Sequence, residues 1–271
     1  MSDYHTWPTI QAVTPTLCRL LGVSLPALCD SRPLDTILEN SQKAFNGLDA
    51  QKCLVFAPDA IGNHLYELHP SLFAPVAEVA PLEVSLQSVV PPVTPTCFAS
   101  MFTGAEPAQH GIRKYDKPVL KCDTLFDALI RAGKRVAIAA VRDCSIDRIF
   151  RDRAIDYFSE DYDPDVTRRV VSLLSKDQHS FILVYHQEYD DQMHATAPFD
   201  PRAIQAARNN MSAFVDIAEA FDTYWSNHDR IIVFAPDHGA HLDPAIGKGS
   251  HGTDIREDME LKHFYGIRKG A

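Results

Sequence analysis

The sequence lacks the features that mark several large classes of protein. It has no basic excess, because 26 Lys and Arg residues stand against 36 Asp and Glu, for a net charge of −10. Nucleic-acid-binding surfaces need basic density, so we expect none here. No stretch approaches 18 uninterrupted apolar residues, so we expect no transmembrane helix and no membrane partner. The first eight residues have neither a basic nor an apolar segment, so no signal peptide is expected.

The cysteines lack the spacing of a metal-binding or redox motif. They are Cys18, Cys29, Cys53, Cys97, Cys122 and Cys144, with no Cys-x-x-Cys among them. In a chain of 271 residues without a signal peptide, this pattern indicates free thiols in a reducing compartment. We therefore expect a cytoplasmic protein. The 45% of hydrophobic and 23% of charged residues are ordinary for a globular protein and suffice for one large core.

What the sequence does contain is an alternation of strand and helix patterns. Strands are expected at 53–57, near 84–90, and at 135–140, 180–185, 230–235 and 261–267. Helices are expected at 9–22, 33–47, 95–103, 124–132, 165–175 and from Pro201 to about Trp225. This order predicts an α/β fold, with a mostly parallel sheet and helices on both faces. No linker or low-complexity tract interrupts the chain, so we expect a single domain over residues 1–271.

One short apolar segment occurs twice. Val55–Asp59 and Val233–Asp237 both read Val-Phe-Ala-Pro-Asp, which is typical of a buried strand that ends at a proline and is followed by an acid. A third apolar run, Phe181–Tyr185, leads to Asp190 and His194. Ligands bind beyond the carboxyl ends of the strands in open α/β sheets. We therefore expect these acids and histidines at one edge of the sheet, where they can form a metal site.

Thr94 and Pro95 mark the start of a helix. Thr is a common N-cap residue and Pro a common first helical residue, so capping alone is one interpretation of Thr94. A helix N-terminus also offers free N–H groups and the positive end of a dipole, which suit a phosphate. A hydroxyl at this position would lie next to the bound anion. The local sequence is compatible with both interpretations.

The residues that follow Thr94 form a pattern with Thr103-Gly104, Pro107 and His110-Gly111-Ile112. This segment resembles the nucleophile segment of the alkaline phosphatase superfamily. The closest branch is the type I phosphodiesterase/nucleotide pyrophosphatase family and its relative phosphonoacetate hydrolase. Four further elements of the superfamily follow in order: Asp59, Asp190-x-x-x-His194, Asp237-His238-Gly239 and Gly249-Ser250-His251-Gly252. The resemblance spans residues 53–267 and implies an alkaline phosphatase-like core.

The resemblance implies two divalent metal ions. It assigns Asp59, Asp237 and His238, with the oxygen of Thr94, to one ion, and Asp190, His194 and His251 to the other. Mixed imidazole and carboxylate ligands suit Zn²⁺ first, with Mn²⁺ as an alternative. Two neighbouring ions can hold the attacking and leaving oxygens of a phosphoryl transfer. Taken singly, each element also has a simpler interpretation, such as a core histidine at His238 or a solvated acidic loop around Asp190.

The implied function is hydrolysis of phosphate esters. A phosphodiesterase or nucleotide pyrophosphatase would use Thr94 as its nucleophile, through a phospho-threonine intermediate, on a small phosphorylated substrate such as a nucleotide. A phosphomonoesterase or a phosphonate hydrolase with the same residues is one alternative. A non-catalytic binding protein stabilised by metal is another.

Two departures from the family pattern concern the substrate. Diesterases of this group carry Asn three residues after the nucleophile, where it helps to hold a phosphate oxygen; here Cys97 stands in that place, and a thiol is a weak donor. Only 12 residues separate His238 from His251, which predicts a minimal cap and an open cleft. Arg113 and Lys114 are expected to lie away from the metals. Without a cation at the phosphate, diesters should be better substrates than monoesters.

Overall fold

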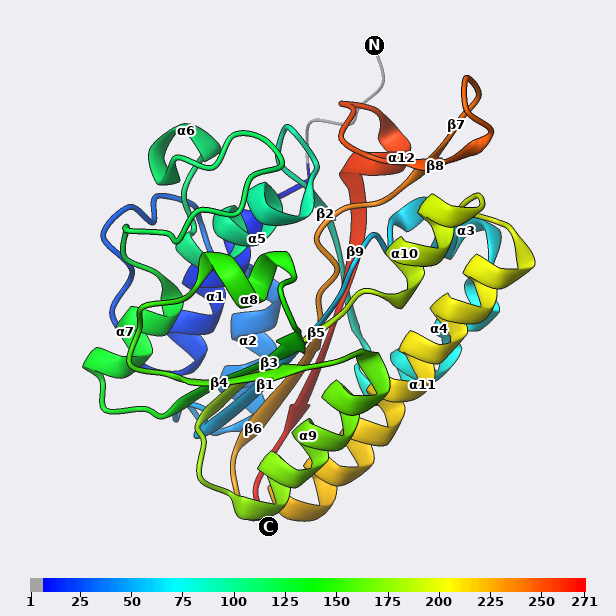
Figure 1. The fold of residues 1–271 in the computed structure, drawn as a ribbon. Helices are drawn as coiled ribbons and strands as arrows, with labels where there is room; N and C mark the ends of the chain where they lie inside the picture. The colour runs from blue at the N-terminus through cyan, green and yellow to red at the C-terminus, as the bar shows by residue number, and fades with distance from the viewer. Residues whose placement is uncertain (1–6) are drawn as a thin grey trace.

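The apolar runs of the sequence form one seven-stranded sheet in the computed structural model, which describes residues 7–271 (Figure 1). Its strands are β1 (Lys52–Pro58), β2 (Leu82–Gln87), β3 (Val136–Val141), β4 (Asp156–Glu160), β5 (Phe181–His186), β6 (Arg230–Phe234) and β9 (Glu260–Arg268). Their spatial order is β2-β9-β6-β1-β5-β3-β4. β9 runs antiparallel to both of its neighbours, and the other pairs are parallel. The predicted mostly parallel sheet is therefore confirmed.

Helices cover both faces of this sheet, as predicted (Figure 1). On one side lie α1 (Val13–Leu20), α2 (Asp35–Ala44), α5 (Thr94–Thr103), α7 (Leu125–Arg131) and α8 (Ser145–Ile149). On the other lie α4 (Pro70–Val79), α9 (Asp163–Lys176) and α11 (Pro201–Tyr224). Shorter elements are η2 (Ile10–Ala12), α3 (Asn63–Leu68), α6 (Pro107–His110), α10 (Glu188–Ala195), α12 (Arg256–Met259) and a hairpin of β7 (His241–Asp243) and β8 (Lys248–Ser250).

Aromatic side chains fill the space between the sheet and each helical layer. One cluster consists of Phe56, Phe73, Phe214, Phe234 and Phe264, and the other of Phe98, Phe102, Phe126, Phe150 and Phe181. Ring pairs at such distances, for example 5.8 Å between Phe56 and Phe234, add to the hydrophobic gain of burial. Because β1 and β5 are buried along their whole length, their sequences read as unbroken apolar runs.

The repeated segment occupies two neighbouring strands. β1 and β6 pair in parallel with Val55 opposite Val233 and Phe56 opposite Phe234. Asp59 and Asp237 therefore leave the sheet side by side. On the other side of β1, Pro58 is opposite His186, so β5 also ends there. The prediction that three strands deliver their polar residues to one edge is confirmed.

Several elements were not predicted from the sequence. β4 was missed because an edge strand with half-exposed side chains, Asp-Tyr-Phe-Ser-Glu, has no apolar run. The segment around Asp190, for which an acidic loop was one interpretation, is helix α10. Three acids lie in its first turn, where the helix dipole stabilises negative charge.

Two further expectations concern the cysteines and membrane spans. All six cysteines are free thiols, as expected. Across residues 7–271, no helix is both long and apolar enough to traverse a bilayer. The expectation about a signal peptide rests on the first eight residues, of which 1–6 lie outside the described part.

Candidate metal centre

Asp59, Asp237 and His238 form a first group of polar side chains at this edge. Asp59 follows β1, while Asp237 and His238 follow β6. The Nε2 atom of His238 lies 3.3 Å from Asp59 Oδ1 and 3.4 Å from Asp237 Oδ2. All three side chains are buried. One ligand atom from each lies within 4.8 Å of the others, so the three can contact a single ion.

Asp190, His194 and His251 form a second group. Asp190 and His194 lie one turn apart on α10, and His251 follows β8. Asp190 Oδ1 lies 3.4 Å from the Nε2 atoms of both histidines. The ring centroids of His238 and His251 are 4.1 Å apart, so the two groups are neighbours. The structure thus brings together all six residues in the two predicted sets.

The three histidines share one orientation. In each, Nδ1 lies within hydrogen-bond distance of a backbone carbonyl: Gly239 for His238 at 2.9 Å, Gly249 for His194 at 3.0 Å and Pro92 for His251 at 3.1 Å. A carbonyl only accepts, so Nδ1 carries the proton. The lone pair of each ring is then on Nε2, the atom that faces the carboxylates. Metal-binding histidines are oriented in this way.

Within residues 7–271, no Lys or Arg lies at ion-pair distance from the carboxylates of the two groups. Burial raises the pKa of Asp59 to about 8, with a further contribution from the charge of Asp190. Burial, with the neighbouring Asp59, also raises the pKa of Asp237 well above its ordinary value. Burial and His251 together lower the pKa of His238, so this ring is neutral. Among the described residues, Asp190 Oδ1 and Asp237 Oδ2 are buried without a hydrogen-bond partner.

A bound cation would satisfy these groups. Buried charges without a partner are costly, and a divalent ion would supply the missing positive charge to each carboxylate. The donors are carboxylate oxygens and imidazole nitrogens, a set that suits Zn²⁺ and, more weakly, Mn²⁺. The residues present therefore fit a divalent ion in each group.

Thr94 lies at the first group. It is the first residue of α5, with Val93 rather than Thr94 at the N-cap, and no side chain caps this helix. The Thr94 hydroxyl instead donates to Asp59, 3.2 Å from Oδ2, and lies 3.3 Å from His238 Nε2. The prediction that Thr94 is the N-cap residue was therefore wrong, and the interpretation of Thr94 as a cap alone fails with it. The Thr94 side chain contacts the buried Asp59 instead of capping the helix.

Tyr185 was not recognised in the sequence. Its hydroxyl donates a hydrogen bond to Asp59 Oδ2, at the end of the neighbouring strand β5. Burial, together with the charge of Asp59, raises the pKa of this phenol well above its usual range, so it remains a donor. A tyrosine at the end of an apolar run was the available signal. It was obscured because tyrosine is also common in buried strands.

Glycines allow two of these contacts. A Cβ atom at Gly249 would lie 2.4 Å from the carbonyl oxygen of Met193 on α10, and a Cβ atom at Gly239 would lie 2.0 Å from that of Glu257. Both distances are too short for any side chain. Gly249 therefore lets β8 approach α10 closely enough for its own carbonyl to accept from His194.

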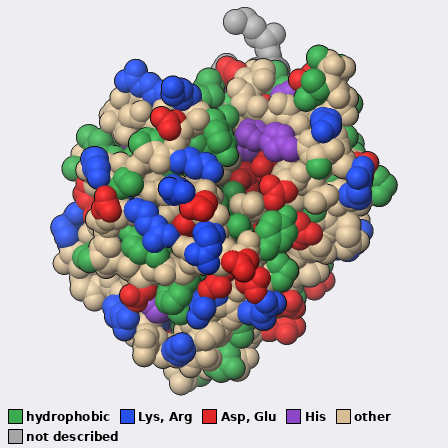
Figure 2. Space-filling view, in the orientation of Figure 1, with side chains coloured by type: hydrophobic (Ala, Val, Ile, Leu, Met, Phe, Trp, Pro, Cys, Tyr) green, Lys and Arg blue, Asp and Glu red, His purple; other side chains and the backbone are tan. Residues whose placement is uncertain are grey.

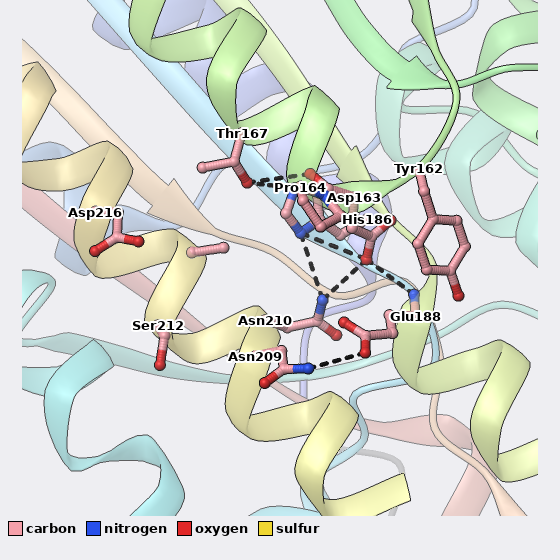
Figure 3. Close-up of a pocket in the computed structure, with 11 residues that line it drawn as sticks. Tyr162, Asp163, Pro164, Thr167, His186, Glu188, Asn209, Asn210, Ser212 and Asp216 are labelled. Atoms are coloured by element: carbon pink, nitrogen blue, oxygen red, sulfur yellow. Dashed lines mark hydrogen bonds and ion pairs between the residues drawn. The ribbon is translucent and has the colours of Figure 1, made fainter. Parts of the chain in front are cut away.

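A buried acid from a different helix holds the start of α10 (Figure 3). The Asp163 carboxylate accepts from the backbone N–H groups of Gln187, at 3.0 Å, and Glu188, at 2.9 Å. It also accepts from Asn210 Nδ2 at 3.2 Å. Asp163, Glu188 and Asn210 also line a separate cavity of about 420 Å³. Asp163 thus acts as an N-terminal cap for α10, the helix that carries Asp190 and His194.

A polar cavity of about 180 Å³ opens beside the two groups. Its lining includes Asp59, Thr94 and Asp190, together with the cations Lys117 and Arg142. Neither cation was recognised in the sequence. The expectation that no cation lies at the phosphate itself stays a prediction. Figure 2 shows a hollow in the surface with histidines and acids in it and Lys and Arg side chains on one side.

Cys97, predicted to contact the substrate, lies deeper. It is fully buried, and its Sγ atom lies 3.1 Å from the hydroxyl oxygen of Ser88. The Ser88 hydroxyl donates to the carbonyl of Asp237. Among the residues that line the described cavity, Cys97 does not occur. Its contact with a substrate stays a prediction.

Comparisons with known proteins show the family and the fold of this chain. A family model described as type I phosphodiesterase / nucleotide pyrophosphatase matches residues 81–242, more than half of the chain. The chain belongs to this family. The matched part of the phosphodiesterase/pyrophosphatase sequence includes Thr94, Asp190, His194, Asp237 and His238, while Asp59 and His251 lie outside it. Comparison with curated protein sequences finds no match.

Several solved structures share the fold. The murine ectonucleotide pyrophosphatase/phosphodiesterase 5, as an inactive threonine-to-alanine variant in complex with AMP, has a TM-score of 0.57 at 17% identity, over 71% of this chain and 58% of that one. The human protein has a TM-score of 0.54 at 18% identity, over 71% and 58%. Phosphonoacetate hydrolase from Sinorhizobium meliloti 1021, with phosphonoacetate, has a TM-score of 0.50 at 17% identity, over 72% and 59%. The chain thus spans about three fifths of the length of these phosphodiesterase-like structures.

We predict that Zn²⁺ binding at the first group becomes weaker as the pH falls from 8 to 6. Without metal, the raised pKa of Asp59, about 8, keeps a proton on this carboxyl below that pH. The ion must displace that proton, whereas His238 is already neutral and contributes none. The affinity should fall by roughly tenfold per pH unit for each proton displaced. Calorimetric titrations in buffers of different ionisation enthalpy would measure the Zn²⁺ affinity and the number of protons displaced. An affinity independent of pH over this range would contradict the prediction.

We also predict that Asp163→Ala weakens metal binding at the second group. The substitution leaves the N–H groups of Gln187 and Glu188 without their acceptor, at a cost of about 1–3 kcal/mol each if they stay buried, so α10 should loosen. Metal titration and thermal unfolding would measure the effect, and Asp163→Asn should recover part of it. The control is Asp165→Ala on the same turn, which removes only a surface pair with Arg168. Equal ion binding in Asp163→Ala and wild type would refute a positioning role.

Proposed function

We propose that the chain is a two-metal hydrolase of phosphate esters, a phosphodiesterase or nucleotide pyrophosphatase with Thr94 as its nucleophile. The observation that carries the proposal is the position of the Thr94 hydroxyl. It contacts both Asp59 and His238 of the first group and lines the cavity that Asp190 of the second group also lines. A structural threonine has no need of such surroundings. Membership of the phosphodiesterase family and the inactive threonine-to-alanine variant of the murine neighbour support it.

Two ions, one in each group, would supply Lewis acidity and positive charge to the attacking and leaving oxygens. Asp59, Asp237 and His238 would hold one ion, and Asp190, His194 and His251 the other. The histidines, whose Nε2 atoms face the carboxylates, suit Zn²⁺ best, with Mn²⁺ as the alternative. Tyr185 would hold the Asp59 carboxylate in place through its hydrogen bond.

In the reaction, the Thr94 oxygen attacks phosphorus from the side opposite the leaving oxygen. The new Oγ–P bond forms as the bond to the leaving group breaks, and the proton of the hydroxyl goes to the leaving oxygen, which gives phospho-threonine and a released alcohol or phosphate. Water then attacks the same phosphorus as the Oγ–P bond breaks; one of its protons goes to Oγ, which restores the hydroxyl and releases the phosphorylated product. Asp59 orients the Thr94 hydroxyl by accepting its hydrogen bond. The substrate is a small phosphorylated compound, and a nucleotide is consistent with the family.

The three residues that follow Thr94 in α5 offer no free backbone N–H group to a phosphate. Pro95 has no N–H, and the N–H groups of Thr96 and Cys97 both donate to the carbonyl of Val93. Charge on the phosphate must therefore be balanced mainly by the ions and by side chains. The six free cysteines support a cytoplasmic location as part of this proposal.

We predict that protein purified without chelator carries about two transition ions per chain. Asp190→Ala and His238→Ala should each remove one of them, because each deletes a ligand from a different group. Elemental analysis would measure the content. Asp191→Ala is the matched control, since its carboxylate accepts from Tyr162 and Gln187 instead. If no metal is bound after incubation with Zn²⁺ or Mn²⁺, the prediction is wrong, and a metal-free structural role of the two groups is favoured.

We predict that Thr94→Ala lowers the hydrolysis of a chromogenic phosphodiester by on the order of 10³-fold or more, because nucleophile deletion is among the costliest changes. Thr94→Ser should keep partial activity. The control is Thr103→Ala, which removes a buried hydroxyl at the other end of α5 that bonds only local backbone. Assays with a diester, a monoester and a phosphonate would rank the substrate classes. A Thr94→Ala protein with most of its rate would show that water attacks directly, and no turnover by wild type with metal would favour a binding protein.

A further inference from the structure

We propose that Lys117 and Arg142 form a subsite that binds a second anionic group of the substrate, a carboxylate or a phosphate, beside the phosphoryl group at Thr94. This inference rests on the proposed function. It adds the substrate class: phosphoryl compounds whose non-leaving portion carries its own negative charge.

The fold brings the two cations together from separate segments. Arg142 directly follows β3, which ends at the same edge of the sheet as β1 and β5. Lys117 belongs to the connection between α6 and α7. Both line the 180 Å³ cavity that also contains Asp59, Thr94 and Asp190. Figure 2 shows Lys and Arg side chains on one side of the hollow that holds the histidines.

Both cations keep their charge available. Lys117 Nζ donates to the carbonyl of Asp143 at 3.2 Å and lies 5.5 Å from the centre of the Tyr115 ring. Neither contact neutralises it, and within residues 7–271 no carboxylate lies at ion-pair distance. Arg142 has one partner, Asp161, at 3.6 Å. The Asp161 side chain is 87% exposed, so water screens this pair and its contribution is small.

The other acids around the cavity already have partners. Asp143 pairs with Arg148 at 2.7 Å. Asp191 accepts from the Tyr162 hydroxyl at 2.9 Å and from Gln187 at 3.2 Å. Asp59 and Asp190 belong to the two candidate metal groups, where ions would offset their charge. Lys117 and Arg142 are therefore the groups left to attract an anion.

The depth of the residues separates this anion from the reacting phosphate. Thr94 is only 3% exposed and lies at the floor of the cavity, whereas the Arg142 side chain is 57% exposed and lies at its mouth. Because the leaving oxygen lies opposite the Thr94 oxygen, the substituent that stays on phosphorus points toward the side of the cavity, and Lys and Arg side chains lie on one side of the hollow (Figure 2). The hydroxyls of Tyr115 and Ser145 also line the cavity. Together with the guanidinium group and the ammonium group, they suit the oxygens of a carboxylate or phosphate.

Three chromogenic substrates test the subsite. All are 4-nitrophenyl esters of phosphonic acids and release the same leaving group; their phosphorus carries an ethyl, a carboxymethyl or a phosphonomethyl substituent. Lys117→Gln and Arg142→Gln should each lower kcat/KM for the two anionic substrates by about tenfold or more, the value of one charge-assisted hydrogen bond. The ethyl substrate should change by less than about twofold. The relative loss of kcat/KM on the carboxymethyl and phosphonomethyl substrates identifies which anion the subsite prefers. Arg142→Lys should recover part of the loss.

The controls are Lys248→Gln and Arg113→Gln, which remove exposed cations that do not line the cavity. Equal losses on all three substrates would mean that the cations serve the reacting phosphate, and no loss would mean that they bind nothing; either result overturns the proposal. If the wild type turns over none of the substrates, the proposed function fails instead. In that case, calorimetry with methylenediphosphonate and metal-loaded protein still tests the subsite. Binding weakened tenfold in the Lys117→Gln/Arg142→Gln double variant supports the subsite, and unchanged binding overturns it.

Discussion

The rest of this structure depends on two buried carboxylates, with a third that is partly buried beside them, at one edge of a mostly parallel sheet. Asp59, Asp190 and Asp237 lie close together. In the described part of the chain, no lysine or arginine pairs with Asp59 or Asp237, and the His238 ring between them is neutral. Such an arrangement is unfavourable on its own terms. It is compatible with a stable fold if the acids are protonated or if cations bind them. The surrounding contacts, which include the hydrogen bonds of the histidines to carbonyls and that of Tyr185 to Asp59, orient these residues for cation binding.

The parts of this centre that could be predicted from the sequence are those fixed by strand periodicity. The two Val-Phe-Ala-Pro-Asp segments lie in register on adjacent strands, so the positions of Asp59 and Asp237 followed from the pattern. Asp190 and His194 have the i, i+4 spacing that places two side chains on one helix face, although the helix itself was left open. His251 was assigned by resemblance to the family, since nothing in its local sequence fixes its position.

The parts that were missed depend on tertiary contacts between segments far apart in the chain. Lys117 lies in a long connection, and a connection has no periodicity from which its path could be inferred. The role of Asp163 requires knowing that the start of α9 contacts the start of α10. The error at Thr94 has a similar origin. Thr before Pro normally caps a helix, but the buried Asp59 offered its hydroxyl a different partner.

The β7–β8 hairpin occupies the short connection between His238 and His251, and its ends are anchored while its tip is free. Gly239 and Gly249 fix the base against Glu257 and Met193, whereas residues 244–246 at the tip are exposed. Added length at an exposed tip costs little entropy and leaves the anchored backbone unchanged. An insertion there would extend the hairpin without displacing His238 or His251 at its two ends. New substrate selectivity could thus evolve, or be engineered, by lengthening this loop while the chemistry below it stays the same.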